Sequence, residues 1–263
     1  MMSALKRIYA VILRIMYFER HNAVRLTEFF YWPLFDIIIW GMTGSWIEKT
    51  QSTPIKLVLL LMTGLVLWQV VLRASYEISV TLMEEMWGRS FINLFATPLN
   101  LVEWIIAVML SGLLKMGLVL LYGGSVVALL YGHNIFAIGW PILFFAVLLM
   151  ISGWAIGFAT AAIIIRLGQR VGSLPWIMSY FFAPFSGVFY PVENLPICAQ
   201  YISYSLPTTY VFDVMREYLQ SGQFLWNKIG MAIGLNALFL STALIFFFRM
   251  FAKSKNRGLY RLE

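Results

Sequence analysis

The stretch IGWPILFFAVLLMISGWAIGFATAAIII, residues 138–165, contains no Asp, Glu, Lys or Arg. A helix needs about 20 largely apolar residues to cross the hydrocarbon core of a bilayer, because each residue adds about 1.5 Å. This stretch exceeds that length, whereas a helix on the surface of a soluble protein would carry a polar face. The sequence therefore predicts a membrane-spanning helix over 138–165.

Five further apolar stretches of comparable length share the chain with it. They cover residues 29–47, 55–72, 101–122, 171–190 and 229–248. The 263 residues are 61% hydrophobic and only 12% charged, and the mean hydropathy of +0.80 lies outside the range of soluble domains. We predict a single all-α domain over residues 1–263, a polytopic membrane protein with six transmembrane helices.

Basic residues collect on one side of these predicted spans. Only Lys49, Lys56, Arg216 and Lys228 fall on the other side, and Arg73 and Lys115 fall inside or near helices. The positive-inside rule therefore places both termini in the cytoplasm, and the net charge of +7 reflects orientation in the membrane and not nucleic-acid binding. The basic residues on the inner side are Lys6, Arg7, Arg14, Arg20, Arg25, Arg89, Arg166, Arg170, Arg249, Lys253, Lys255, Arg257 and Arg261.

The segment before the first span, residues 1–28, has apolar residues at helical spacing on one arc and basic residues on the opposite arc. We predict an interfacial amphipathic helix over residues 4–21, with membrane lipids as its partner. Packing of the helix on the bundle is the alternative. The apolar arc contains Leu5, Ile8, Tyr9, Ile12 and Met16, and the opposite arc contains Lys6, Arg7, Arg14 and His21.

Two segments between spans are long enough to form helices. On the inner side, Met83, Trp87, Phe91 and Leu94 recur at helical spacing, which predicts an amphipathic helix over 82–96 that rests on lipid or docks into a partner's groove. On the outer side, residues 191–226 are too apolar for a free loop. We expect two short helices there, capping the bundle or dipping into the outer leaflet.

Few polar groups fall inside the predicted spans. Asp36 lies near the middle of the first span and Lys115 lies in the third, where a charge costs roughly 2.5 to 3.5 kcal/mol. They form a structural pair, or Asp36 is protonated and hydrogen-bonded, or they are a site for protons or substrate. Arg73 and Glu77, four residues apart, are expected to be boundary charges at the end of the second span.

Aromatic residues crowd the fifth span, which Pro175 and Pro184 are expected to bend. Flat aromatic faces suit either a protein core or a path for a bulky amphipathic or sugar-bearing substrate. The candidates for a substrate pathway are Asp36, Trp40, Tyr180, Phe181, Phe185, Phe189 and Tyr190.

Small residues at four-residue spacing allow helices to approach closely. They occur as Gly153, Gly157 and Ala161 in the fourth span and as Gly230 and Gly234 in the sixth. Each set predicts packing within the chain or a seam between subunits.

The sequence does not favour an enzyme. His21 and His133 lie on opposite sides of the predicted membrane, so they cannot share a metal site. The phosphate-binding pattern GxxxxGK[ST] is absent. We expect no catalytic residue, metal or cofactor in this chain, and any ATP would be bound by another chain.

This order of elements resembles the permease subunit of ABC-2 type transporters. The outer run Phe189, Tyr190, Pro191, Val192, Glu193, Asn194, Leu195 and Pro196, followed by Leu206, Pro207, Thr208, Thr209, Tyr210 and Arg216, is similar to the family's outer signature of Pro191, Leu195, Pro196, Pro207 and Arg216. The inner run Glu84, Glu85, Gly88, Leu94, Thr97 and Pro98 is similar to its coupling-helix region.

The resemblance implies an ATP-driven exporter in the bacterial cytoplasmic (inner) membrane. A second permease copy would complete the pore as a dimer, and separate nucleotide-binding subunits holding ATP and Mg would engage the coupling helix. Substrates implied by the family include drugs, lipids, glycolipids and polysaccharides. An ion-coupled transporter or channel using Asp36 and Lys115 is the alternative function. The residues expected to contact the ATPase are Met83, Glu84, Glu85, Trp87, Gly88, Phe91 and Leu94.

Overall fold

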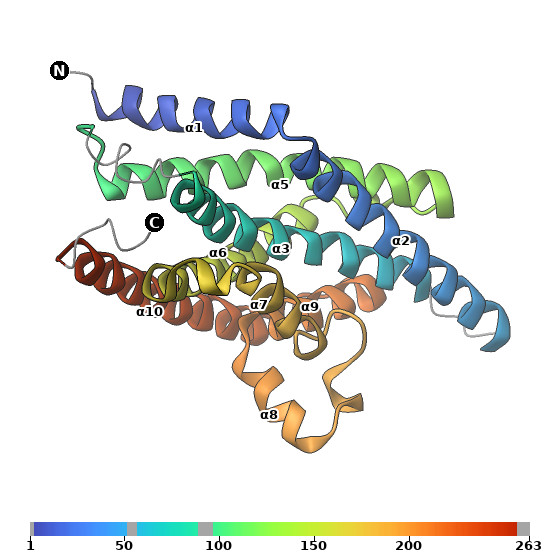
Figure 1. Cartoon of the computed structure of the whole chain (residues 1–263). Helices are drawn as coiled ribbons and strands as arrows, with labels where there is room; N and C mark the ends of the chain where they lie inside the picture. Colours follow the sequence, from blue (N-terminus) through green and yellow to red (C-terminus); the bar gives the residue numbers. More distant parts are fainter. Residues whose placement is uncertain (1–2, 52–56, 89–96, 257–263) are drawn as a thin grey trace.

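The computed structural model describes residues 3–51, 57–88 and 97–256, and all regular secondary structure within these ranges is helical (Figure 1). The prediction of an all-α fold is confirmed. The longer helices lie side by side as a bundle. They are α1 (Ala4–His21), α2 (Ala23–Gln51), α3 (Leu57–Trp87), α5 (Leu101–Tyr131), α6 (Pro141–Leu167) and α10 (Trp226–Asn256). The shorter α-helices are α7 (Leu174–Phe182), α8 (Ile197–Ser205) and α9 (Pro207–Ser221).

Within the described residues, four helices are long and apolar enough to cross a membrane: α3, α5, α6 and α10. They make this a multi-pass membrane protein and correspond to the predicted second, third, fourth and sixth spans. α2 has 29 residues, but it carries Asp36 and is rich in Trp and Tyr, which are only partly apolar, and it is not among the four.

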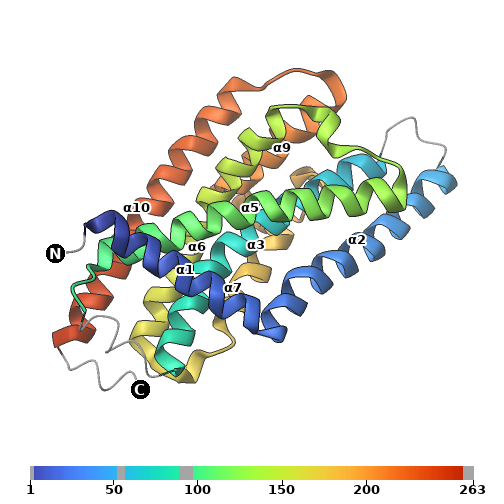
Figure 2. The same ribbon diagram turned by 90° about the horizontal axis from the view of Figure 1, so that it is seen from above.

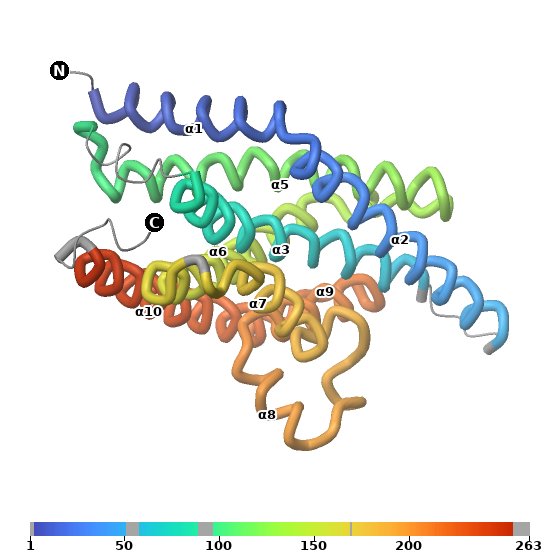
Figure 3. The backbone as a smooth tube through the Cα atoms, in the orientation of Figure 1, coloured from blue at the N-terminus to red at the C-terminus, as the bar shows by residue number. Residues whose placement is uncertain are grey.

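The predicted fifth span is not one continuous helix. Residues 171–190 divide into the end of η2 (Gly168–Val171), the nine-residue α7, the 3₁₀ turn η3 (Ala183–Phe185) and a turn at Gly187. Pro184 has no N–H to continue the helical ladder, and Gly187 takes φ +74°, which side chains disfavour. The chain then runs through η4 (Val192–Asn194) into α8, which projects from the bundle (Figure 3).

α3 is also longer than predicted. It continues 15 residues beyond the expected end at residue 72, to Trp87. The segment 73–87 contains neither Gly nor Pro, so nothing in the backbone stops the helix. Residues 82–87 are thus the last turns of α3 and not the start of a separate helix, and the rest of the predicted coupling helix, 89–96, lies outside the described residues.

The core is centred on α3, which α2, α5, α6 and α7 surround. In the most apolar part of α3, 89% of the residues are buried, compared with 22% for α10. α3 and α6 approach closely because α6 presents glycines: a Cβ on Gly153 would lie 2.6 Å from the Val71 carbonyl oxygen. The small residues of the fourth span therefore pack within the chain. Gly230 and Gly234 of α10 have open space beside them.

α1 lies on α5 and runs parallel to its first half (Figures 1 and 2). Ile8, Val11, Ile12 and Ile15 face the bundle, and Val11 and Ile15 are buried. The predicted bounds of this helix are confirmed, but it packs on the bundle, which was the alternative to lying free in the interface. A second apolar stripe stays exposed and contains Leu5, Tyr9 and Met16.

One end of the bundle holds the first turn of α1, the last turns of α3, α6 and α10 and the first turn of α5 (Figure 2). We call it the basic end, because α1 begins with Lys6 and Arg7, α6 ends near Arg166, and α10 ends near Arg249 and Lys253.

Candidate functional site

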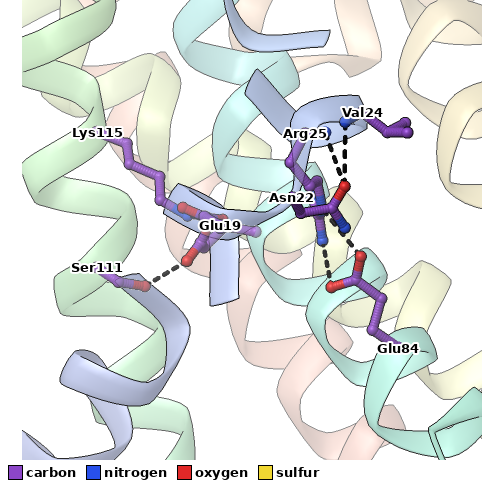
Figure 4. Close-up of polar contacts among 8 residues, drawn as sticks. Glu19, Asn22, Val24, Arg25, Glu84, Ser111 and Lys115 are labelled. Carbon is purple, nitrogen blue, oxygen red and sulfur yellow. Dashed lines mark hydrogen bonds and ion pairs between the residues drawn. The ribbon is translucent and has the colours of Figure 1, made fainter. Parts of the chain in front are cut away.

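A charged cluster lies where α1 meets α2, beside α3 and α5 (Figure 4). Asn22 separates the two helices, and its Oδ1 accepts hydrogen bonds from the backbone N–H groups of Val24 and Arg25, at 3.1 and 3.4 Å. This cap begins α2. It places Arg25 against α3, where the guanidinium donates to both carboxylate oxygens of Glu84, at 3.0 and 2.7 Å. A bidentate pair of this kind is strongly oriented, so it fixes the start of α2 on the end of α3.

Lys115 of α5 lies in the same cluster. Its ammonium group donates to the carboxylates of Glu19 in α1 and Glu77 in α3, and Ser111 also donates to Glu77. Burial and the charge of Glu77 raise the pKa of Glu19 above its ordinary value, against the opposing effect of Lys115. One cation therefore joins three helices.

These contacts correct two predictions. Asp36 and Lys115 do not pair, because Asp36 instead accepts a hydrogen bond of 2.9 Å from the Gln69 side chain. Glu77 is not a boundary charge paired with Arg73, because it is 3% exposed and bound to Lys115. The hydrogen bond from Gln69 agrees with the alternative of a hydrogen-bonded Asp36. The boundary-charge prediction failed because α3 continues past residue 72 and carries Glu77 into the bundle, where α5 supplies its partner.

Two further ion pairs hold α1 in place. Arg7 donates to Glu103 at the start of α5, at 2.8 Å, and Arg14 donates to Glu85 at the end of α3, at 2.7 Å. The Arg7–Glu103 and Glu19–Lys115 pairs both join residues 96 positions apart. Because the offset is the same, α1 and α5 run parallel and in register over this length.

Arg73 of α3 differs from these paired cations. Its guanidinium donates to the backbone carbonyl of Glu28 and lies over the Phe29 ring, 5.0 Å from its centre. No carboxylate of the described chain forms an ion pair with it, and its Nε is buried without a hydrogen-bond partner. A buried charge in this state favours the approach of an anionic or strongly polar group.

Two cavities meet at Arg73 and Tyr76. The first, which we call the elbow cavity, has a volume of about 240 Å³ and opens between α1, α2, α3 and α5. The second, the groove cavity, has a volume of about 260 Å³ and lies between α2, α3 and α7. The groove cavity is lined by Glu28, Trp32, Gln69, Leu72, Arg73, Tyr76, Trp176 and Tyr180.

The predicted pathway residues divide among three places. Tyr180 lines the groove cavity, and Asp36 is bound to Gln69 in its wall. Trp40 and Phe189 stack on each other with ring centres 4.7 Å apart. Phe181 contacts Phe185 at 5.8 Å and is 55% exposed, whereas the Tyr190 hydroxyl donates to the Pro184 carbonyl at 3.1 Å. Of the predicted pathway residues, only Tyr180 and Asp36 therefore belong to the groove.

The predicted ATPase-contact residues have different exposures. Met83 is buried against the core, and Glu84 and Glu85 are bound to Arg25 and Arg14. Trp87 is 45% exposed at the end of α3, next to Gly88. Phe91 and Leu94 lie outside the described residues.

The outer signature residues have structural roles. Arg216 of α9 donates to the backbone carbonyl of Tyr190 at 3.0 Å and lies 3.4 Å from Asp213, which also binds Lys228. Burial lowers the pKa of Arg216. Pro191 precedes η4, Leu195 and Pro196 precede α8, and Pro207 begins α9. These contacts fasten the segment after α7 to α9 and α10.

No group of three or more His, Cys, Asp or Glu side chains within the described ranges is placed to hold a metal ion. No protein-family model matches the chain, and no curated protein matches it. Function is therefore inferred from the geometry of the chain itself.

The sequence prediction missed most of the groove and the cluster. Gln69, Trp176, Glu19 and Glu77 were not recognised as members of a site, since the helices that bring them together are far apart in sequence. One signal was available: polar Gln69, Arg73 and Glu77 recur every four residues through a segment without helix breakers, which places them on one face of a continuous helix.

Proposed function

We propose that this chain is the membrane permease subunit of an ATP-driven exporter of the ABC-2 type, working as a dimer with separate ATPase subunits. The observation that carries the proposal is the groove cavity between α2, α3 and α7. An ionisable residue inside a membrane bundle is by default a candidate for a functional site. Here Arg73 lies among Trp32, Tyr76, Trp176 and Tyr180, a polar centre in an aromatic wall.

The exposed face of α2 supports pairing with a second copy. Large apolar side chains remain uncovered along it, among them Trp32, Phe35, Ile39, Met42 and Trp46. Lipid or another subunit could cover them. A second copy placed there would close the open side of the groove and enclose a path for an amphipathic drug, lipid, glycolipid or saccharide.

α3 supports a mechanism of coupling. Arg73 in the groove and Trp87 at the basic end belong to one helix, 14 residues or about 21 Å apart. Glu84 and Glu85 join the end of this helix to α2 and α1. A push on Trp87 by an ATPase would therefore move α3 and α2, two of the three helices that line the groove. The positive charge of the basic end agrees with a cytoplasmic location for Trp87.

The alternative of an ion-coupled carrier relied on Asp36 and Lys115 acting together. These residues belong to separate hydrogen-bond groups, and we do not pursue it.

Purification from native membranes in mild detergent tests the proposal. The wild-type chain should carry a nucleotide-binding ATPase, identified by peptide mass analysis and by ATP hydrolysis. The amount of ATPase retained by the Trp87→Ala variant should fall by at least about tenfold. A Trp buried in an interface contributes about 2 kcal/mol or more to the free energy of binding. Trp226→Ala is the matched control, because Trp226 is 67% exposed at the start of α10, far from the basic end. Absence of any ATPase from the wild type, or equal retention by both variants, would contradict the proposal.

A further inference from the structure

The elbow cavity has the chemistry of a binding site and shares only Arg73 and Tyr76 with the groove cavity. Its lining includes four cations, Arg20, Arg25, Arg73 and Lys115, and two carboxylates, Glu19 and Glu77. Both carboxylates are bound by Lys115, and Arg25 is neutralised by Glu84. Within the described chain, Arg20 and Arg73 are left without a carboxylate. With Glu84 counted as the partner of Arg25, and Glu28 assigned to the groove cavity that it lines, four positive and three negative charges leave the elbow cavity with a net charge of +1.

The two unpaired cations differ in exposure. Arg20 is exposed at the last turn of α1. Arg73 is held by the Glu28 carbonyl and the Phe29 ring, and its buried Nε still lacks an acceptor. Glu28 lines the groove cavity and not the elbow cavity. A phosphate or carboxylate placed between the two guanidiniums would supply the missing acceptor.

The rest of the cavity is apolar and opens sideways. Leu26 and Phe30 of α2 and Leu114 and Leu118 of α5 line it, and these side chains are 42%, 46%, 56% and 56% exposed. An opening with exposed leucines suits hydrocarbon. A small water-soluble anion would gain nothing from these walls, because they offer it no hydrogen bonds.

We propose that the elbow cavity binds an anionic glycerophospholipid of the surrounding membrane, with its phosphate between Arg20 and Arg73 and an acyl chain along Leu114 and Leu118. A phosphodiester with one negative charge would neutralise the cavity. The cavity is bordered by α1, α2, α3 and α5, so the bound lipid would join α1 to the rest of the bundle. This site does not depend on the proposed transport function.

Native mass spectrometry of the purified full-length chain tests the proposal. In the presence of equal amounts of phosphatidylglycerol and phosphatidylcholine, the wild type should retain one lipid per chain, and that lipid should be phosphatidylglycerol in preference to phosphatidylcholine. Arg20→Gln should weaken that binding about tenfold, because it removes one charged hydrogen bond. Arg166→Gln, at the exposed end of α6 and outside the cavity, should leave it unchanged. Arg20 is chosen because its exposure makes misfolding of the variant easy to exclude by circular dichroism.

Two further measurements separate the lipid from a free anion. Leu118→Asp should weaken phosphatidylglycerol binding to a similar extent by placing a charge on the acyl chain's path. Millimolar inorganic phosphate should not displace the lipid. The proposal is overturned if phosphatidylcholine is retained equally well, if Arg20→Gln and Arg166→Gln behave alike, or if inorganic phosphate competes.

Discussion

At the scale of single residues, Glu19 is a carboxyl group of the charged cluster whose pKa is raised by its surroundings. It shares the ammonium of Lys115 with Glu77, and Arg25 lies nearby on α2. Burial and the second carboxylate favour its protonated form, so its pKa is higher in the folded protein than the value of 4.5 expected in an unfolded chain. Protonation thus stabilises the fold at this position.

This shift predicts how stability depends on pH. The contribution of Glu19 to the free energy of unfolding is fully present below pH 4.5 and is lost as the pH rises through the raised pKa. Glu19→Gln mimics the protonated form and should remove this part of the pH dependence. Thermal unfolding in detergent from about pH 4 to pH 7 measures it: the wild type should lose stability relative to Glu19→Gln as the pH rises. Glu48→Gln, whose side chain lies outside the cluster at the end of α2, should keep the wild-type pH profile. Parallel curves for the wild type and Glu19→Gln would refute the assignment.

At the scale of elements, the contact between α3 and α6 determines how tightly the bundle packs. A Cβ on Gly153 would meet the Val71 carbonyl at 2.6 Å and the Ala74 Cβ at 2.7 Å, and one on Gly157 would meet the Ser75 carbonyl at 2.9 Å. Backbone atoms cannot move aside without separating the helices. The glycines therefore set the distance between the two most buried helices of the core.

Gly153→Ala should consequently destabilise the protein by about 1 to 3 kcal/mol, the usual range for overpacking, despite the better helix propensity of Ala. Gly230→Ala on α10 is the matched control, because nothing lies within 4 Å of the added methyl group. It should be neutral or stabilising by up to about 1 kcal/mol. Denaturant titration in mixed micelles compares the two variants. Equal stabilities would mean that α3 and α6 do not approach as described.

Prediction from the sequence succeeded where a single element determines the result. The bounds of α1, and the identities of α5, α6 and α10 as apolar helices, follow from local periodicity and hydropathy. The end of α3 was missed because Arg73 and Glu77 resemble boundary charges until Lys115, from another helix, is seen to bind Glu77. The length of α7 was missed because Pro184 was expected to bend the helix and not to end it, and because the positive φ of Gly187 was not foreseen. Local hydropathy and periodicity predict where a helix forms. They do not predict which residue of another helix will pair with a buried charge.

At the scale of the whole molecule, ion pairs connect four of the helices into one unit. Arg7–Glu103, Arg14–Glu85, Arg25–Glu84 and Lys115–Glu77 link α1, α2, α3 and α5. α6 packs on α3, and α10 packs on α6 through apolar contacts such as Phe158 with Phe247, whose ring centres lie 5.5 Å apart. Force applied at the end of α3 would therefore move the charged half of the molecule as a body against the apolar half.

That role requires the end of α3 to face the cytoplasm, and the single cysteine of the chain allows a direct test. Cys198 is exposed on α8, in the segment expected to lie outside. In intact cells, a membrane-impermeant maleimide should label Cys198 in the wild type. The double variant Cys198→Ser, Gly88→Cys moves the cysteine to the exposed end of α3. Its labelling should require permeabilised cells. As a control for reactivity, both proteins should be labelled in detergent. Labelling of position 88 from outside would place Trp87 beyond the reach of any cytoplasmic ATPase. The groove, whatever passes through it, would then need another source of energy.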